Sequence, residues 1–195
     1  MTPQLTPELT KQFYIEACQK FGATIVQKDD SEFMAAIATV LNQLNITDRD
    51  DFMKRFTTTI GTKIYVPFDV GIAGDYTLED QVDVLVHELV HVQQYDANEP
   101  KFVLCYLLNE AARAEYEAQA YSADMEMHYW RTGRIYDIRG RAQLLDNYAL
   151  EQDEINFAAE YMESIATTIQ EGAAVNNVAA WAMDWMEQHG VQGAA

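Results

Sequence analysis

The sequence predicts an α+β fold that is mostly helical, with one small antiparallel sheet near the middle of the chain. Apolar residues recur at helical spacing over most of the sequence, and only one segment is rich in β-branched residues on both sides of a glycine. The 195 residues are 49% hydrophobic and 23% charged. That is enough apolar material for a single domain with its own core. We therefore expect one domain spanning residues 1–195.

The amino-terminal part is expected to form two helices. Apolar residues at helical spacing predict the first from Pro7 to about Phe21, with Gly22 as its stop signal. A second stripe of apolar residues predicts a helix from Ser31 to Leu44. Ser31 is expected to be its N-cap, because a serine hydroxyl can accept a free amide of the first turn.

A β-hairpin is expected over the β-rich segment that follows. Two β-branched runs, Thr57–Ile60 and Lys63–Val66, are separated only by Gly61 and Thr62. Pro67 closes the second run, at a possible sheet edge, since proline cannot donate to a sheet ladder. This is the one strand pair that the sequence predicts.

The rest of the chain is expected to be helical. Thr77 and Asp80 form a near-capping box, which predicts a helix from Thr77 to about Tyr95. After a turn, a long helix is expected from Pro100 or Lys101 through at least His128. Residues 141–188 are expected to form two or three further helices.

The chain is strongly acidic. Thirteen Lys and Arg stand against 31 Asp and Glu, a net charge of −18. Such a surface argues against nucleic-acid and anionic-membrane partners, both of which require clustered cations. No secretory signal and no apolar run of about 18 residues is visible, so a cytoplasmic location is expected. Cys18 and Cys105 are expected to be reduced thiols.

A candidate metal-binding motif lies at residues 87–91, with the sequence His87-Glu88-Leu89-Val90-His91. Residues four apart on a helix share one face, so the two imidazoles can bind the same metal ion. Zn²⁺ suits imidazole ligands and lowers the pKa of a bound water. Glu88 lies beside that water and can take its proton. The motif therefore predicts a zinc-dependent hydrolase with Glu88 as the general base.

A third ligand must come from farther along the chain. A histidine does not follow at the metzincin spacing. The next predicted helix offers Glu110, Glu115 and Glu117. Glu110 and Glu117 share a face but lie about 10 Å apart along the helix axis, so only one of them can reach the metal.

Two strings resemble a known family. Residues 87–95, HELVHVQQY, followed by residues 116–121, YEAQAY, are similar to small bacterial and phage-type gluzincin metallopeptidases. The resemblance covers about residues 57–130. It implies a zincin-like core with helical extensions at both ends, bound Zn²⁺, Glu117 as the third ligand, and a peptide or protein substrate. Asn109-Glu110 has instead the spacing of the larger, thermolysin-like gluzincins, so Glu110 stays an alternative.

Supporting roles can also be assigned. Asp124 lies seven residues after Glu117, on the face where it can orient a ligand histidine. Tyr121 is the preferred donor to the oxyanion that hydrolysis generates. The strand Lys63–Val66 is the candidate for pairing with an extended substrate. The remaining candidates for the oxyanion donor are Arg113, Tyr116 and His128.

Two hypotheses follow for the function. The first is a gluzincin-type zinc metallopeptidase, in which a zinc-activated water attacks the substrate and Glu88 is the general base. The alternative is a non-catalytic zinc-binding structural or interaction module with a zincin fold. Glu88 favours the first, because a purely structural zinc site has no use for a general base and is usually closed by four protein ligands.

Overall fold

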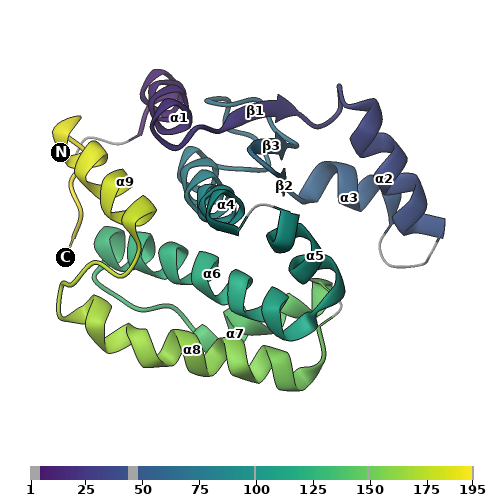
Figure 1. Cartoon of the computed structure of the whole chain (residues 1–195). Helices are drawn as coiled ribbons and strands as arrows, with labels where there is room; N and C mark the ends of the chain where they lie inside the picture. The colour runs from purple at the N-terminus through teal and green to yellow at the C-terminus, as the bar shows by residue number, and fades with distance from the viewer. Residues whose placement is uncertain (1–4, 44–47, 99, 149, 195) are drawn as a thin grey trace.

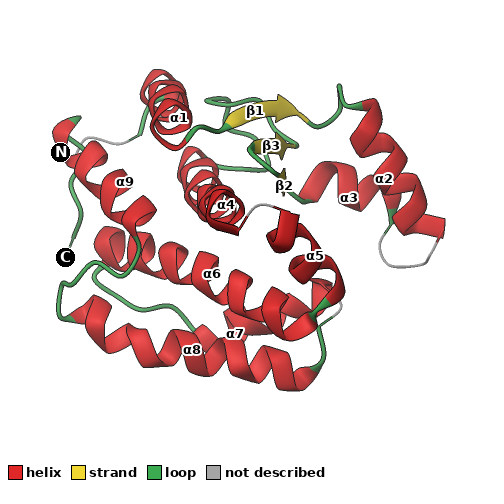
Figure 2. Cartoon of the chain, viewed as in Figure 1, coloured by secondary structure: helices red, strands yellow, loops and turns green. Residues whose placement is uncertain are grey.

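The structure is a computed structural model, and it describes residues 5–43, 48–98, 100–148 and 150–194. The described chain is mostly helical with one small sheet (Figures 1 and 2), which confirms the predicted α+β class. The strands are β1 (Thr24–Gln27), β2 (Thr58–Ile60) and β3 (Lys63–Val66). The helices are α1 (Pro7–Phe21), α2 (Glu32–Gln43), α3 (Arg49–Arg55), α4 (Leu78–Asn98), α5 (Pro100–Leu108), α6 (Glu110–Thr132), α7 (Ile138–Ala142), the 3-10 helix η1 (Gln143–Tyr148), α8 (Gln152–Gln170) and α9 (Asn177–Gln188).

The sheet has the strand order β1-β3-β2. β2 and β3 form the predicted antiparallel hairpin, with Thr59 opposite Ile64. β1 was not predicted. It pairs in parallel with β3, so the sheet is mixed and not purely antiparallel. A four-residue strand with no clear alternation gives no local signal, and its partner lies about 40 residues away, from Thr24 to Lys63.

The central position of β3 overturns one expectation. Lys63–Val66 is hydrogen-bonded to a strand on each side, so its main chain has no free edge for a substrate. The prediction that this strand pairs with an extended substrate is therefore wrong, as is its placement at a sheet edge. Among the described residues, β2 is the edge strand on the side of the sheet away from β1.

Three predicted helix boundaries are confirmed, whereas α4 runs on to Asn98, past the predicted end near Tyr95. Gly22 ends α1 with a left-handed φ of 68°. The Ser31 hydroxyl accepts a main-chain amide of the first turn of α2, while Leu44 lies outside the described residues. Thr77 and Asp80 exchange main-chain to side-chain hydrogen bonds of 2.9 and 3.1 Å at the start of α4.

The long helix expected from Pro100 through His128 is broken into two. Asn109 is extended, with φ −131° and ψ 107°, and its side chain accepts the amide of Ala112 as the N-cap of α6. Asparagine favours this role because its side-chain oxygen replaces a missing helical acceptor. The break separates α5 from α6 and lets α5 approach the end of α4 at its own angle. α6 then runs to Thr132 and ends at Gly133, with φ 67°.

The helix α4 lies at the centre of the molecule (Figure 1). On one side it packs against the sheet, α1 and α9, in a core that includes Phe13, Ile64 and Leu89. On the other side it packs against α6. A second core, which includes Met125 and Met162, lies between α6 and α8. α6 is therefore covered on two sides, and its side chains facing α4 are shielded from water.

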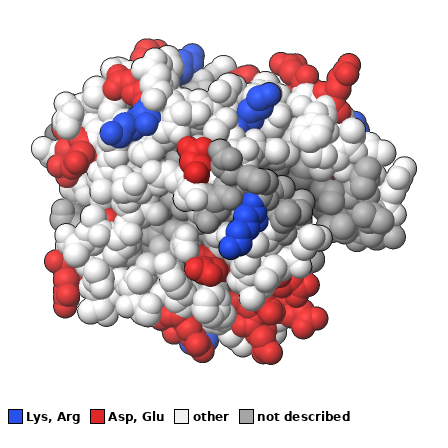
Figure 3. Space-filling view, in the orientation of Figure 1, with Lys and Arg blue, Asp and Glu red and all other residues white. Residues whose placement is uncertain are grey.

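The surface keeps the acidic character of the sequence. On the face drawn in Figure 3, Asp and Glu side chains are spread widely and Lys and Arg are fewer. None of the described helices combines the length and the hydrophobicity that crossing a membrane requires.

Candidate metal centre

A row of polar side chains runs along the contact between α4 and α6. The residues on α4 are four apart and those on α6 are seven apart, so each set shares one helix face. Because numbers rise along α4 as they fall along α6, the two helices run antiparallel. The row pairs Asp83 with Arg131, His87 with Asp124, and His91 with Glu117.

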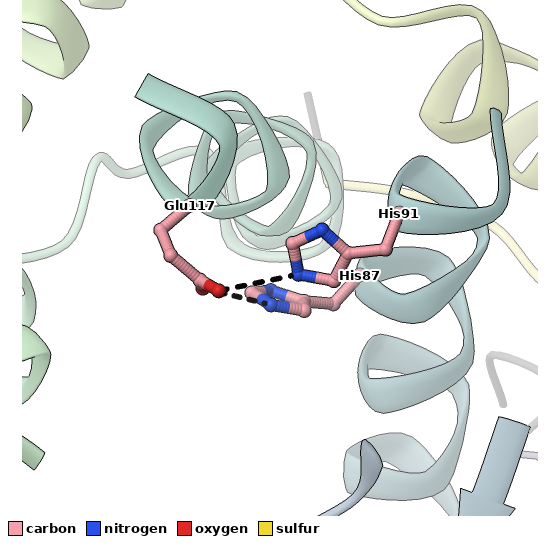
Figure 4. A group of neighbouring side chains, drawn as sticks. All are labelled: His87, His91 and Glu117. Atoms are coloured by element: carbon pink, nitrogen blue, oxygen red, sulfur yellow. Dashed lines mark ion pairs between the residues drawn. The ribbon is translucent and has the colours of Figure 1, made fainter. Parts of the chain in front are cut away.

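Three of these side chains converge on one point. Glu117 projects from α6 toward His87 and His91 on α4 (Figure 4). Its two carboxylate oxygens lie 3.5 Å from His87 Nε2 and 3.5 Å from His91 Nε2. One ligand atom from each residue lies within 4.8 Å of the other two, which is compatible with a shared metal ion. The sequence-predicted set of His87, His91 and Glu117 is thus brought together.

The other ring nitrogen of each histidine is already engaged. His87 Nδ1 lies 3.1 Å from Asp124 Oδ2, as the sequence predicted for Asp124. His91 Nδ1 lies 2.8 Å from Gln94 Oε1, and the Gln94 amide nitrogen donates to the Tyr116 carbonyl. Asp124 and Gln94 lie where each can accept a proton from Nδ1, so a metal ion at Nε2 would meet the unprotonated nitrogen of each ring. This is how histidines are oriented for metal binding.

The electrostatics of the centre favour a positive charge between these groups. Burial lowers the pKa of His87, but the carboxylates of Asp124 and Glu117 outweigh it and raise that pKa well above its usual value. Burial raises the pKa of Glu117, but the two histidines bring it below its usual value. Among the described residues, Glu117 Oε2 and Asp124 Oδ1 are buried without a hydrogen-bond partner. A buried oxygen without a hydrogen-bond partner is a common position for a bound ion or water. A divalent cation fits this set of two imidazoles and a carboxylate.

Glu88 lies at the flank of the centre and is turned toward the sheet. Its side chain is buried, with 7% exposure. Its Oε2 accepts a 2.6 Å hydrogen bond from Thr59 Oγ1 on the edge strand β2. The carboxylate is therefore held between α4 and the sheet edge, and Glu88 directly follows His87 in the chain. The sequence did not point to Thr59.

The two alternative third ligands lie elsewhere. Glu110 is in the first turn of α6 and Glu115 is one turn further along, and both side chains are exposed. Within the described part of the chain, the grouping of potential ligands consists of His87, His91 and Glu117. The geometry thus favours Glu117 among the three candidates.

Tyr121 and Tyr106 flank the centre. The ring of Tyr121 packs edge-on against His87, with centroids 5.1 Å apart. The Tyr106 hydroxyl, on α5, donates a 2.5 Å hydrogen bond to Glu117 Oε1. Burial and the charge of Glu117 raise the pKa of Tyr106, which keeps its hydroxyl a donor. The sequence missed Tyr106 because it lies in an apolar run and its position depends on the break at Asn109.

The other candidates for an oxyanion donor are directed elsewhere. The Arg113 guanidinium donates to the main-chain carbonyl of Tyr106. The ring of Tyr116 packs on Phe102, with centroids 4.8 Å apart. The His128 ring packs against the ring of Tyr136. Among the described aromatic residues, Tyr121, Tyr106 and Phe102 contact the ligand set, and Phe102 has no hydroxyl to donate.

The centre is largely shielded from solvent. The side chains of His87, His91 and Glu117 are 12%, 8% and 0% exposed. A low-dielectric environment of this kind strengthens the attraction between a cation and its ligands. Comparison of the chain with protein-family models, with curated proteins and with solved structures gives no match, so its chemistry is inferred from its own residues.

Proposed function

We propose that this protein is a zinc-dependent metallohydrolase of the gluzincin type, most simply a peptidase with a zincin-like fold. His87, His91 and Glu117 bind Zn²⁺, and Glu88 is the general base. One observation carries the proposal: three ligand atoms on two facing helices lie within 4.8 Å of one another. Glu88 follows His87 in the chain, and the Thr59 hydroxyl fixes its carboxylate.

Each residue has a chemical task in this proposal. The bound zinc supplies Lewis-acid polarisation and a lowered pKa for water. Glu88 accepts a proton from the attacking water and delivers it to the leaving amine, which avoids the release of an unstable anion. Asp124 and Gln94 hold the two imidazoles in the orientation that exposes Nε2. Tyr121 is the candidate to donate to the developing oxyanion, while Tyr106 donates to Glu117 and orients it.

The edge strand β2 is the proposed place for the substrate main chain. An extended peptide can add to a free sheet edge through main-chain hydrogen bonds. Among the described residues β2 has one neighbouring strand, β3, on one side only. Since Thr59 of β2 contacts Glu88, a peptide along this edge passes beside the general base. β2 thus takes the role that the sequence assigned to Lys63–Val66.

The low exposure of the centre favours a second candidate, a non-catalytic zinc-binding module. A site at 0–12% exposure is what a structural metal needs, whereas hydrolysis also requires room for water and substrate. Three protein ligands and a buried, oriented Glu88 favour the enzyme. Zinc binding without hydrolysis of any peptide would favour the non-catalytic zinc-binding module over the enzyme.

Removal of the metal tests the proposed function. The purified, zinc-loaded chain is incubated with a pool of unstructured peptides, and products are identified by mass spectrometry. We expect cleavage that a zinc chelator abolishes and that added Zn²⁺ restores, because the nucleophile of the proposed mechanism is a water activated by zinc. Cleavage that persists fully after zinc has been stripped would contradict the proposal.

The hydrogen bond to Glu88 leads to a further prediction. Thr59→Val keeps the shape of the side chain but removes the donor to Glu88 Oε2. A hydrogen bond to a charged group contributes about 1.5–3 kcal/mol, so kcat is expected to fall about tenfold or more while zinc content is unchanged. Thr57→Val is the matched control, because Thr57 Oγ1 is buried without a hydrogen-bond partner among the described residues. Equal kcat values for the two variants would show that Thr59 does not orient the base.

A further inference from the structure

An open groove of about 550 Å³ lies at the turn of the β2–β3 hairpin, away from the metal ligands. α2, the hairpin and the end of α4 form its walls. Two large apolar side chains in it face solvent: Phe33 is 54% exposed and Ile60 is 37% exposed. The lining consists of Phe33, Ile60, Gly61, Thr62, Lys63, Tyr65 and Tyr95.

The groove is continuous with the elements that position the metal centre. Successive residues of a strand point to opposite faces of the sheet. Thr59 points to the α4 side, where it contacts Glu88, so Ile60 points to the other side, where it lines the groove. Tyr95 follows the ligand His91 by one turn of α4 and contributes to the same groove. The edge strand and the helix with the zinc ligands therefore both border it.

A peptide added to the edge of β2 would follow the same alternation. Residues directly opposite one another in neighbouring strands direct their side chains to the same face. A substrate residue opposite Thr59 then faces α4 and Glu88. The adjacent residue, opposite Ile60, directs its side chain toward the groove. The residue that fills the groove is thus within two positions of the bond that lies beside Glu88.

The lining determines which side chain fits. Phenyl, phenol and aliphatic surfaces form the larger part of the lining, Lys63 adds one charged group at its border, and the volume lies in the usual range for ligand sites. Gly61 adds no side chain to the groove. A Cβ there would lie 3.6 Å from the ring of Tyr95, so any side chain at this position would narrow the space.

We propose that this groove is the specificity subsite of the enzyme and that it binds one aromatic or large aliphatic side chain of an extended peptide substrate. The inference rests on the proposed peptidase function and adds to it a preference for one apolar residue close to the cleaved bond. Full burial of such a side chain corresponds to about a ten- to hundredfold gain in kcat/KM over alanine.

Matched peptides test the proposal. Each series carries Phe, Leu or Ala at one position within two residues of the cleaved bond, and kcat/KM is measured for the zinc-loaded wild type and for Phe33→Ala. We expect the wild type to prefer Phe or Leu over Ala about ten- to hundredfold at one position. Phe33→Ala should reduce this ratio about tenfold, with unchanged zinc content and unchanged unfolding temperature, because the side chain is 54% exposed.

Phe157→Ala is the matched control. Phe157 is on α8, is 47% exposed, and does not line the groove, so its removal should leave the ratio intact. A preference that is the same in Phe33→Ala and wild type overturns the subsite while the zinc-dependent hydrolysis stands. Absence of hydrolysis for every peptide overturns the proposed function and the subsite with it. If Phe33→Ala instead shifts a monomer–dimer equilibrium and leaves the preference unchanged, the groove is an interface between copies of the chain.

Discussion

Glu88→Gln is expected to lower kcat by about 10²–10⁴-fold and to leave zinc binding intact, because general acid–base catalysis contributes a factor of this size. The amide keeps the size of the carboxylate and can still accept from Thr59, whose hydroxyl donates to Glu88 Oε2. It cannot take a proton from water. Peptide hydrolysis and zinc content are measured on the same preparation, so that loss of the base is distinguished from loss of the metal.

The control for this variant is Glu79→Gln. Glu79 is on the same helix, in its first turn and two turns before His87, so its loss removes an equal charge from α4 without touching the centre. Normal turnover is expected for it. If Glu88→Gln has the same kcat as Glu79→Gln, Glu88 is not the general base.

Glu117→Gln is expected to weaken zinc binding by about 100-fold or more. Loss of a partner that only orients a ligand already costs about 10–100-fold in metal affinity, and Glu117 is proposed as a ligand itself. Its oxygens lie 3.5 Å from both His87 Nε2 and His91 Nε2. The affinity is measured by competition with a chromophoric zinc chelator, and circular dichroism verifies that the variant is folded.

Glu110→Gln and Glu115→Gln are the controls, since the two exposed carboxylates were the alternative ligands in the sequence. Both variants should bind zinc as the wild type does. Zinc binding that survives in a folded Glu117→Gln protein, or that is lost in Glu110→Gln, would assign the third ligand differently.

The pairing of the two candidate ligand histidines was predictable because their geometry is local. Residues four apart on a helix share a face whatever the tertiary structure is, so the sequence alone places His87 and His91 together. The choice of Glu117 as the third candidate ligand depends on tertiary structure, namely the angle and register at which α6 packs against α4. The sequence offered three glutamates, and the resemblance to gluzincins preferred the one that the structure brings to the histidines.

Features that depend on distant contacts were missed. β1 pairs in parallel with a strand about 40 residues later, and such a pairing leaves no local pattern. The break at Asn109 turns α5 so that Tyr106 reaches Glu117, which a continuous helix would not allow. Thr59 contacts Glu88 only because the hairpin packs against α4. Tyr106 and Thr59 border the centre, so the sequence predicted the candidate ligands better than their surroundings.

The metal centre itself can be tested by metal analysis combined with X-ray absorption at the zinc edge of the purified chain. The account predicts one zinc per chain, bound by two imidazole nitrogens and otherwise by oxygen at about 2.0–2.2 Å, with water among the oxygen ligands. A chain that retains no zinc under saturating conditions would contradict it, and so would a sulfur ligand or a shell closed by four protein side chains.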